Sequence, residues 1–415
     1  MKNLFIIGAG ASGMMAAISA SMQAEISNED VKITVLENES VVGRKILVTG
    51  NGKCNLSNKD MSVKNYHCKN TGFIQAVFNR FDGNQTVSFF ECLGLMIKEK
   101  NGYLYPNTLQ ASSVTEILLC EMLRRNISLH CNTHVVNVIK ENGIFKILTS
   151  TFYTYEADAV IFACGSPAGG VSGADASGYT IAAKLGHNVI PLIPSLVQLR
   201  SKDNCFGSLA GIRINATVTL LGNEREYAKE NGEIQITDYG VSGIPVFQLS
   251  GTCAELIEDD KKVELIIDFL PDEAYEDVLI YLRERMNILG YKKISKFLTG
   301  MFPEALCNEM IKRTCLPKSA LVSEMEEEHL RLILDQIKRF YVRIYAVNPL
   351  KHAQVARGGI DIFEIDPDTM SSRIVEGLYF AGELVDVDGR CGGYNLQWAW
   401  SSGFVAGVSA VNYLK

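Results

Sequence analysis

The sequence lacks the markers of several protein classes. None of its 11 cysteines forms a Cys-x-x-Cys pair, and its six histidines show no close ligand spacing. Both patterns argue against a disulfide framework or a metal site, and the free thiols favour the cytoplasm. No segment supplies the roughly 20 uninterrupted apolar residues of a membrane span. The formal net charge of −7 disfavours a broad nucleic-acid-binding surface. We therefore expect a cytoplasmic protein with no metal, no membrane contact and no nucleic-acid partner.

Internal repeats and low-complexity linkers are also missing. The 415 residues, 47% of them hydrophobic and 21% charged, are typical of a soluble globular protein. A chain of this length can form about two or three domains with a substantial core.

The first part of the chain has the order strand, glycine-rich turn, helix, strand and acid. An apolar strand at Leu4–Ile7 runs into Gly8–Gly13, which is a G-x-G-x-x-G, and a helix of small residues follows. A second strand at Val31–Leu36 ends in Glu37. A secretory signal is the alternative, since Lys2 precedes this stretch, but it does not explain the second strand or Glu37. The order indicates a dinucleotide-binding βαβ unit.

Each residue type in this unit has a physical role. Gly8 permits the tight turn, Gly10 lets a pyrophosphate approach the backbone, and Gly13 lets the helix pack close to the sheet. The amino end of the helix offers free N–H groups and a partial positive charge to phosphates. Glu37 can accept hydrogen bonds from a ribose 2′-OH, which favours an adenosine without a 2′-phosphate.

The middle of the chain has a different texture. Its first part has the pattern of short strands separated by turns such as Asn231-Gly232. Its second part has charged and apolar residues at helical spacing. We therefore predict one nucleotide-binding domain interrupted by an insert. The predicted parts are a discontinuous nucleotide-binding domain at 1–190 and 345–415, a β-rich insert at 191–271 and 340–344, and a helical subdomain at 272–339.

A second glycine turn near the end of the chain favours FAD over a freely exchanging nicotinamide. A strand ends in Phe380-Ala381-Gly382-Glu383, which places an acid where it can bind ribityl hydroxyls. Gly392 and Gly393 precede a final helix that reaches the neighbourhood of Tyr413. The dipole of this helix would stabilise negative charge on the N1/O2 edge of a reduced flavin. The alternative is that these glycines form ordinary turns.

The most distinctive string extends from Gly43 to Asn58. Its glycines suit tight turns, and its asparagines carry both donors and acceptors that could clasp a flavin ring. Arg44 or Lys45 could meet a phosphate or the anionic edge of the flavin. Alone, the string could equally be a polar surface loop.

Together, the string 43–58, the Tyr379–Glu383 turn and the segment 392–403 resemble the BaiN-like family of bacterial FAD-dependent oxidoreductases. The resemblance covers the whole chain. It implies an α/β, Rossmann-like two-dinucleotide-binding FAD domain with an inserted β-barrel-like and helical domain. The FAD contacts that it implies are Gly8, Gly10, Ser12, Gly13, Glu37, Arg44, Lys45, Asn51, Gly52, Cys54, Asn55, Gly382, Glu383, Gly393, Asn395 and Leu396, with Val135 touching adenine through its backbone.

The sequence identifies no catalytic residue. Cys54 could be a redox partner of the flavin, but no second cysteine is near it in sequence, so packing or backbone contact is the favoured role. No second G-x-G-x-x-G is present for NAD(P)H, which would then bind transiently over the flavin. We predict NAD(P)H-driven reduction of an electron-poor C=C bond or related group in a small molecule. The alternatives are an amine or ketone oxidase that uses O₂, and a flavin-binding sensor or partner-binding protein without turnover.

Overall fold

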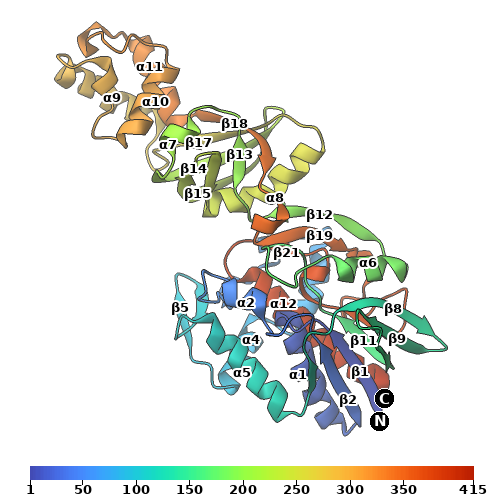
Figure 1. Ribbon diagram of the computed structural model, residues 1–415. Helices are drawn as coiled ribbons and strands as arrows, with labels where there is room; N and C mark the ends of the chain where they lie inside the picture. Colours follow the sequence, from blue (N-terminus) through green and yellow to red (C-terminus); the bar gives the residue numbers. More distant parts are fainter. The chain divides into compact units, whose positions relative to one another are not determined.

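Figure 1 shows a computed structural model that describes all 415 residues. The chain divides into two compact units. The first unit comprises Met1–Ile193 and Leu350–Lys415, and the second comprises Pro194–Pro349. No helix is both long enough and apolar enough to cross a membrane.

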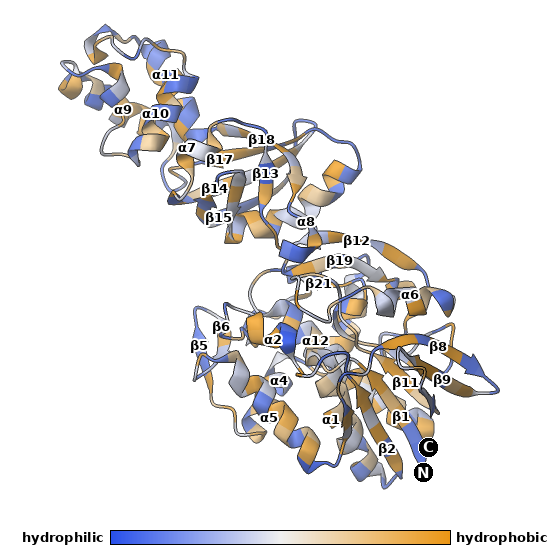
Figure 2. Cartoon of the chain, viewed as in Figure 1, coloured by the Kyte–Doolittle hydropathy of each residue, from blue (hydrophilic) through white to orange (hydrophobic).

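A five-stranded sheet forms the centre of the first unit. Its order is β20-β11-β1-β2-β7, and every neighbouring pair is parallel. The buried ends of β1 and β2 are apolar except for Thr34, as suits a sheet covered on both faces, and these strands are largely orange in Figure 2. The bounds are β1 Lys2–Ile7, β2 Val31–Leu36, β7 Ser128–His130, β11 Ala159–Phe162 and β20 Leu378–Phe380.

Two helices from opposite ends of the chain pack together beside this sheet. They are α1 (Ala11–Ser27) and α12 (Tyr394–Leu414). Both helices have small residues at the contact, so their backbones approach closely. A Cβ on Gly407 would lie 2.3 Å from the Ala16 carbonyl oxygen. The carboxyl-terminal segment therefore completes the domain that the first residues begin.

Smaller sheets and helices surround this centre. The small sheets are β10-β9-β8, β12-β19, β21-β4 and β3-β6-β5. Their strands are β3 Ser57–Asn58, β4 Tyr66–His67, β5 Ile97–Lys100, β6 Tyr103–Pro106, β8 Val135–Glu141, β9 Ile144–Thr149, β10 Thr154–Ala157, β12 Val189–Ser195, β19 Val355–Ile360 and β21 Asp388–Gly389. The helices are α2 Arg44–Val48, α3 Thr71–Arg80, α4 Gly83–Cys92, α5 Ala111–Arg124 and α6 Ser177–Lys184.

The second unit contains a closed barrel with the order β13-β16-β15-β14-β17-β18. Its neighbouring strands are antiparallel, and alternate residues of β17 and β18 point into the core. The strands are β13 Leu199–Ser201, β14 Arg213–Gly222, β15 Arg225–Ile236, β16 Gly240–Gly243, β17 Val263–Asp268 and β18 Phe340–Val347. The short α7 (Phe206–Leu209) and the longer α8 (Ile244–Glu258) pack on the barrel.

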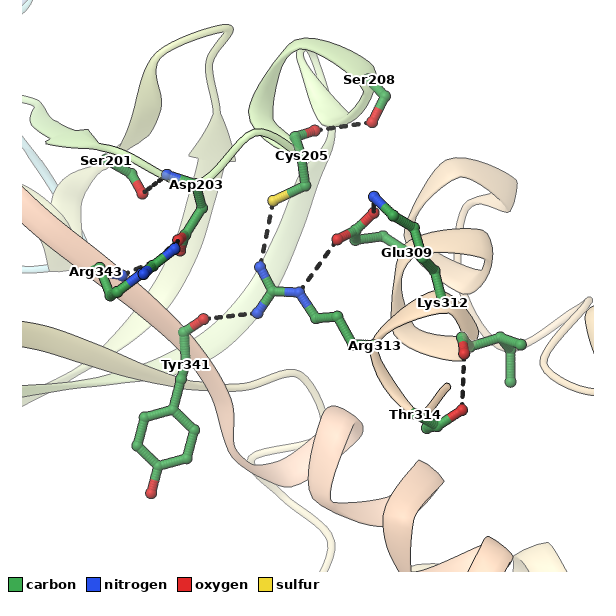
Figure 3. Close-up of polar contacts among 11 residues, drawn as sticks. Ser201, Asp203, Cys205, Ser208, Glu309, Lys312, Arg313, Thr314, Tyr341 and Arg343 are labelled. Atoms are coloured by element: carbon green, nitrogen blue, oxygen red, sulfur yellow. Dashed lines mark hydrogen bonds and ion pairs between the residues drawn. The ribbon is translucent and has the colours of Figure 1, made fainter. Parts of the chain in front are cut away.

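Three helices stand between β17 and β18 in the sequence. They are α9 Tyr275–Leu289, α10 Glu304–Arg313 and α11 Glu327–Lys338. Arg313, the last residue of α10, connects this helix to the barrel. Its guanidinium donates to the Tyr341 carbonyl at 2.7 Å and to Cys205 Sγ at 3.3 Å, and it lies 3.8 Å from the Phe340 ring centroid. Figure 3 shows the contacts of Arg313 with Tyr341 and Cys205.

The predicted fold class, a Rossmann-like domain with a barrel-like insert, is confirmed. The predicted turn at Asn231-Gly232 is wrong, because both residues lie inside β15 and pair with Thr217 and Ala216. The hairpin turns instead at Asn223 and Glu224, which have φ of 48° and 65°. Two successive left-handed residues match the right-handed twist of the flanking strands.

Candidate cofactor site

The turn between β1 and α1 has the geometry that a pyrophosphate requires. Gly8 has a φ of +102°, and a Cβ on it would lie 2.5 Å from the Ala163 carbonyl oxygen. A Cβ on Gly13 would lie 1.9 Å from the Gly8 carbonyl oxygen, so the backbone excludes a side chain at both positions. A Cβ on Gly10 would meet nothing within 4 Å. The space beside the amino end of α1 is therefore open to a phosphate.

Glu37 follows β2 and is anchored to this turn. Its Oε2 accepts a hydrogen bond from the Ala9 N–H at 2.7 Å, and its Oε1 accepts one from the Glu39 N–H at 2.9 Å. A carboxylate has about four acceptor positions, so two remain for other donors such as ribose hydroxyls. The backbone contacts fix the orientation of the acid in the position that the sequence predicts.

The turn after β20 lies directly against the first turn. Since β20 is two strands from β1 in a parallel sheet, both turns lie at the carboxyl edge of that sheet. Gly382 has a φ of +73°, and a Cβ on it would lie 2.4 Å from Ser12 Oγ. The Gly382 N–H donates to Ser402 Oγ at 2.9 Å, and its carbonyl accepts from Trp398 Nε1 at 3.0 Å. Helix α12 therefore holds the second turn in contact with the first.

Lys45 and Glu383, two of the predicted cofactor residues, form an ion pair. The Glu383 carboxylate also accepts from Ser166 Oγ at 2.7 Å and from the Ala356 N–H at 2.9 Å. Lys45 Nζ lies 3.3 Å from the same serine hydroxyl. The side chain of Glu383 is thus held in one place, and a positive charge stands beside it. This arrangement suits a ligand that carries both phosphates and hydroxyl groups.

The string 43–58 is partly helical, not an extended polar loop. Arg44 begins α2 and forms an ion pair with Glu39 at 2.9 Å. Asn51 and Gly52 then adopt left-handed backbone with φ of 55° and 79°. Cys54 is also left-handed, with a φ of 56°, which is uncommon for such a residue and marks a constrained position.

The thiol of Cys54 is fully buried. Burial raises its pKa to about 12, although a hydrogen bond with the Thr49 side chain opposes the shift. Almost no thiolate is therefore present near neutral pH, and the nucleophilic form of cysteine is the thiolate. The environment favours a packing role for this residue.

The amino end of α12 lies against the end of the string. A Cβ on Gly393 would lie 2.5 Å from the Ser57 carbonyl oxygen, and the Asn55 carboxamide lies 3.3 Å from the Gly393 nitrogen. The Asn395 carboxamide accepts from the Gly389 N–H and donates to the Gly389 carbonyl, both at 2.8 Å. The side chain of Asn395 therefore fixes the backbone of β21.

Two other predicted contacts have apolar side chains. Val135 opens β8 and is buried, and Leu396 lies in the first turn of α12 and packs against the core. Either residue could touch a cofactor only through its backbone or by packing.

Several polar residues near these turns were missed by the sequence reasoning. Gln397 in α12 is fully buried and donates to Thr86 and Ser401 hydroxyls at 2.7 and 2.9 Å, and it accepts from Ser57 at 2.6 Å. A glutamine between apolar residues of a buried helix is the signal that could have revealed it. Asp386 and Asp388 gave no comparable local signal.

These residues fit FAD. The open amino end of α1 suits the pyrophosphate of FAD. The anchored carboxylate of Glu37 suits the hydroxyls of the ribose, and the carboxylate of Glu383 at the second turn suits those of the ribityl chain. No group of three or more His, Cys, Asp or Glu residues is arranged to hold a metal ion.

Comparison with known proteins places this geometry in context. The sequence profile of the HI0933-like protein Rossmann domain matches residues 2–409. The chain is 38% identical over 410 residues to the 3-dehydro-bile acid delta(4,6)-reductase of Clostridium scindens, and the match covers 99% of both chains. It is 29% identical over 410 residues to the ribosomal RNA dihydrouridine synthase of Haemophilus influenzae, and that match covers 97% of both chains.

Solved structures show a similar fold at low sequence identity. The 3-ketosteroid-delta4-(5alpha)-dehydrogenase of Rhodococcus jostii RHA1 aligns with a TM-score of 0.51 and 14% identity, over 99% of this chain and 97% of that chain. The 3-ketosteroid delta1-dehydrogenase of Sterolibacterium denitrificans aligns with a TM-score of 0.51 and 11% identity, over 99% of this chain and 100% of that chain.

Proposed function

The chain belongs to the HI0933-like Rossmann-domain family as a BaiN-like FAD-dependent oxidoreductase, and we propose that it uses NAD(P)H to reduce an electron-poor C=C bond of a small molecule. The observation that carries the proposal is the full-length similarity to a relative named as a delta(4,6)-reductase. The site agrees with it, because two glycine turns and two anchored acids lie at one sheet edge.

We assign the chain's own residues to distinct tasks. The amino end of α1 and Lys45 provide positive charge for phosphates, and Glu37 and Glu383 provide fixed acceptors for sugar hydroxyls. FAD, when bound, supplies the two-electron chemistry by accepting hydride from one partner and passing it to the other. The cysteines are all free thiols, which agrees with a reducing compartment, and we propose a cytoplasmic location.

The nicotinamide has no G-x-G-x-x-G unit of its own in this chain. We therefore propose that NAD(P)H and the substrate occupy the same flavin face in turn. Such an exchange predicts ping-pong kinetics, with one product leaving before the second substrate binds.

A second candidate substrate is a uracil base in RNA. The relative in Haemophilus influenzae is named as a ribosomal RNA dihydrouridine synthase, and the C5=C6 bond of uracil is also conjugated to a carbonyl. The insert gives RNA little electrostatic attraction, because residues 194–349 contain 24 Asp and Glu against 19 Lys and Arg. The small-molecule substrate is therefore favoured.

Anaerobic stopped-flow absorbance of the flavin separates these functions. For the proposed reductase, NADH or NADPH bleaches the flavin, and an α,β-unsaturated ketone then restores its colour. Restoration by a uridine-containing rRNA fragment but not by the enone would favour the RNA substrate. Bleaching by an amine or amino-ketone, with none by NAD(P)H, would establish an oxidase. If no compound reduces the flavin within minutes, the result would favour the alternative of a flavin-binding sensor or partner-binding protein.

A matched variant pair links the result to the site. Glu383→Gln removes the charge that meets Lys45, whereas Glu376→Gln changes a residue outside the two turns. We expect the first variant to lose FAD affinity and the second to keep it. Equal affinities would remove Glu383 from the cofactor site.

A further inference from the structure

One glycine-rich loop contacts both ends of the cofactor site. Ser166, just after β11, is buried and donates to the Glu383 carboxylate at 2.7 Å. Ser172, further along the same loop, donates to Glu39 Oε1 at 2.7 Å. The Glu39 N–H in turn donates to Glu37 Oε1 at 2.9 Å. The loop therefore extends from the acid that we assign to the ribityl chain to the neighbour of the acid that we assign to the ribose.

The strand order brings this loop past the glycine-rich turn. The loop leaves β11, which lies on one side of β1, and its far contact, Glu39, follows β2 on the other side of β1. The three strands are parallel, so their carboxyl ends lie at one edge of the sheet. A chain that connects the ends of the outer two strands passes the end of β1. The turn Gly8–Gly13, which we assign to the pyrophosphate, begins at that point.

The loop has a buried base and an exposed outer part. Ser166 and Ala168 are 1% and 0% exposed. Residues 169–170 and 172–173 are exposed, and we call the segment 169–175 the strap. Because the strap buries little apolar surface, lifting it from the domain costs little free energy.

Glycine is required at two points of the strap. Gly170 has a φ of +57°, and a Cβ on it would lie 2.8 Å from the Lys351 carbonyl oxygen. Gly173 has a φ of +80°, and a Cβ on it would lie 2.5 Å from Glu39 Cγ. The strap therefore lies directly against the domain at both points. The second point is next to the hydrogen bond of Ser172 with Glu39, and we call that hydrogen bond the latch.

Another contact of the strap lies near the latch. Asp175 Oδ2 lies 3.5 Å from His134 Nε2, a buried atom without a hydrogen-bond partner. His134 precedes Val135, which the sequence predicts to touch adenine. The Thr133 N–H donates to the Glu37 carbonyl at 2.7 Å. Both contacts therefore hold the strap at the adenosine end of the site.

We propose that the strap opens to admit FAD and closes over its adenosine and pyrophosphate half. The inference rests on FAD as the cofactor in the proposed function and does not depend on the substrate. Ser172 and Glu39 hold the strap closed, so FAD can enter or leave only after this hydrogen bond has broken. Weakening the latch should therefore speed the release of FAD.

Ser172→Ala tests the latch, because it removes the hydroxyl and adds no bulk. We expect FAD to dissociate about 3–10-fold faster from this variant than from the wild type, since a hydrogen bond to a charged group is lost. FAD association should not be slower. The rise in flavin fluorescence after rapid dilution of the FAD-loaded protein gives the dissociation rate. Ser113→Ala is the matched control, since it removes an exposed hydroxyl that pairs with Thr108 at 2.9 Å, and it should release FAD at the wild-type rate.

Gly173→Ala separates the fit of the strap from backbone strain. Its matched control is Gly143→Ala, because Gly143 has a similar φ of +84° but a Cβ on it would meet nothing within 4 Å. Both variants carry the strain of a left-handed alanine. Only Gly173→Ala should release FAD faster, by about tenfold or more, because its methyl group prevents the strap from closing on Glu39.

Hydrogen exchange reports the strap without any flavin signal. In the FAD-loaded protein, amides of residues 169–175 should exchange faster in Ser172→Ala than in the wild type, with β8 and β9 unchanged. The proposal is overturned if Ser172→Ala releases FAD at the wild-type rate, or if Gly173→Ala and Gly143→Ala release it equally fast. If the wild type binds no FAD at all, the cofactor assignment fails, and the role of the strap in FAD retention fails with it. FAD binding with unchanged release rates in the variants refutes the strap alone.

Discussion

Replacing Gly403 by alanine should lower both the stability of the folded protein and its affinity for FAD. A Cβ at this position in α12 would lie 2.4 Å from the carbonyl oxygen of Ser12. Real Cβ atoms keep at least 3.0 Å, so the helix or the turn must move by about 0.6 Å, the difference between these distances. Ser12 belongs to the glycine-rich turn that we assign to the pyrophosphate, so the movement reaches the site.

Two opposing contributions set the change in the free energy of unfolding that Gly403→Ala causes. Alanine in a helix interior gains about 1 kcal/mol over glycine. Overpacking costs about 1–3 kcal/mol, and the upper end applies here because a backbone oxygen cannot rotate away as a side chain can. The expected net loss is about 1–2 kcal/mol in the free energy of unfolding. FAD binding should weaken by about 1 kcal/mol, the value of one displaced backbone hydrogen bond.

Gly407→Ala provides a matched comparison one turn further along α12. Its Cβ would lie 2.3 Å from the Ala16 carbonyl oxygen, so the steric cost is similar, but the contact lies outside the glycine-rich turn. Gly207→Ala in α7 is the control without a steric clash, since its Cβ would meet nothing within 4 Å. Urea unfolding gives the stabilities, and fluorescence titration of the apoprotein gives the FAD affinities. The reasoning is refuted if Gly403→Ala is as stable as the wild type, or if both α12 variants lose FAD affinity equally.

Three further changes have defined outcomes. Glu37→Ala should weaken FAD binding by about 1–3 kcal/mol, because an anchored charged acceptor is lost and the Ala9 N–H loses its partner; unchanged affinity in a titration would exclude this acid from the site. Cys54→Ser should keep its flavin and most of its activity, and a loss of turnover above about 10³-fold in a folded, flavin-loaded variant would demand a chemical role for the thiol. Asp386→Asn should stabilise the protein at neutral pH. The folded wild type holds a proton that the unfolded chain releases, so its stability falls as pH rises from the usual aspartate value of 3.8 to the raised pKa of Asp386. Urea midpoints that keep the same pH slope in this variant would contradict a raised pKa for Asp386.

Some turns were predictable from local sequence and others were not. The strand and turn at 4–13 and the acid Glu37 could be located because each conformation follows from neighbouring residues. The turn at Asn231-Gly232 could not, since cross-strand pairing with β14 overrides the local preference of that dipeptide. The helix at Arg44–Val48 was likewise missed, because five residues are too few to show helical periodicity.

The sequence by itself determined where the two glycine turns lie, and it predicted an insert that interrupts the first domain. These features depend on residue types and spacings within short segments, where glycine and apolar runs leave few conformations open. The ion pair of Lys45 with Glu383, the network of Gln397 and the pairing of Arg357 with Asp388 depended on the tertiary structure. Their partners lie far apart in the chain, and burial and distance, which set the energies of charges and hydrogen bonds, exist only once the chain has folded.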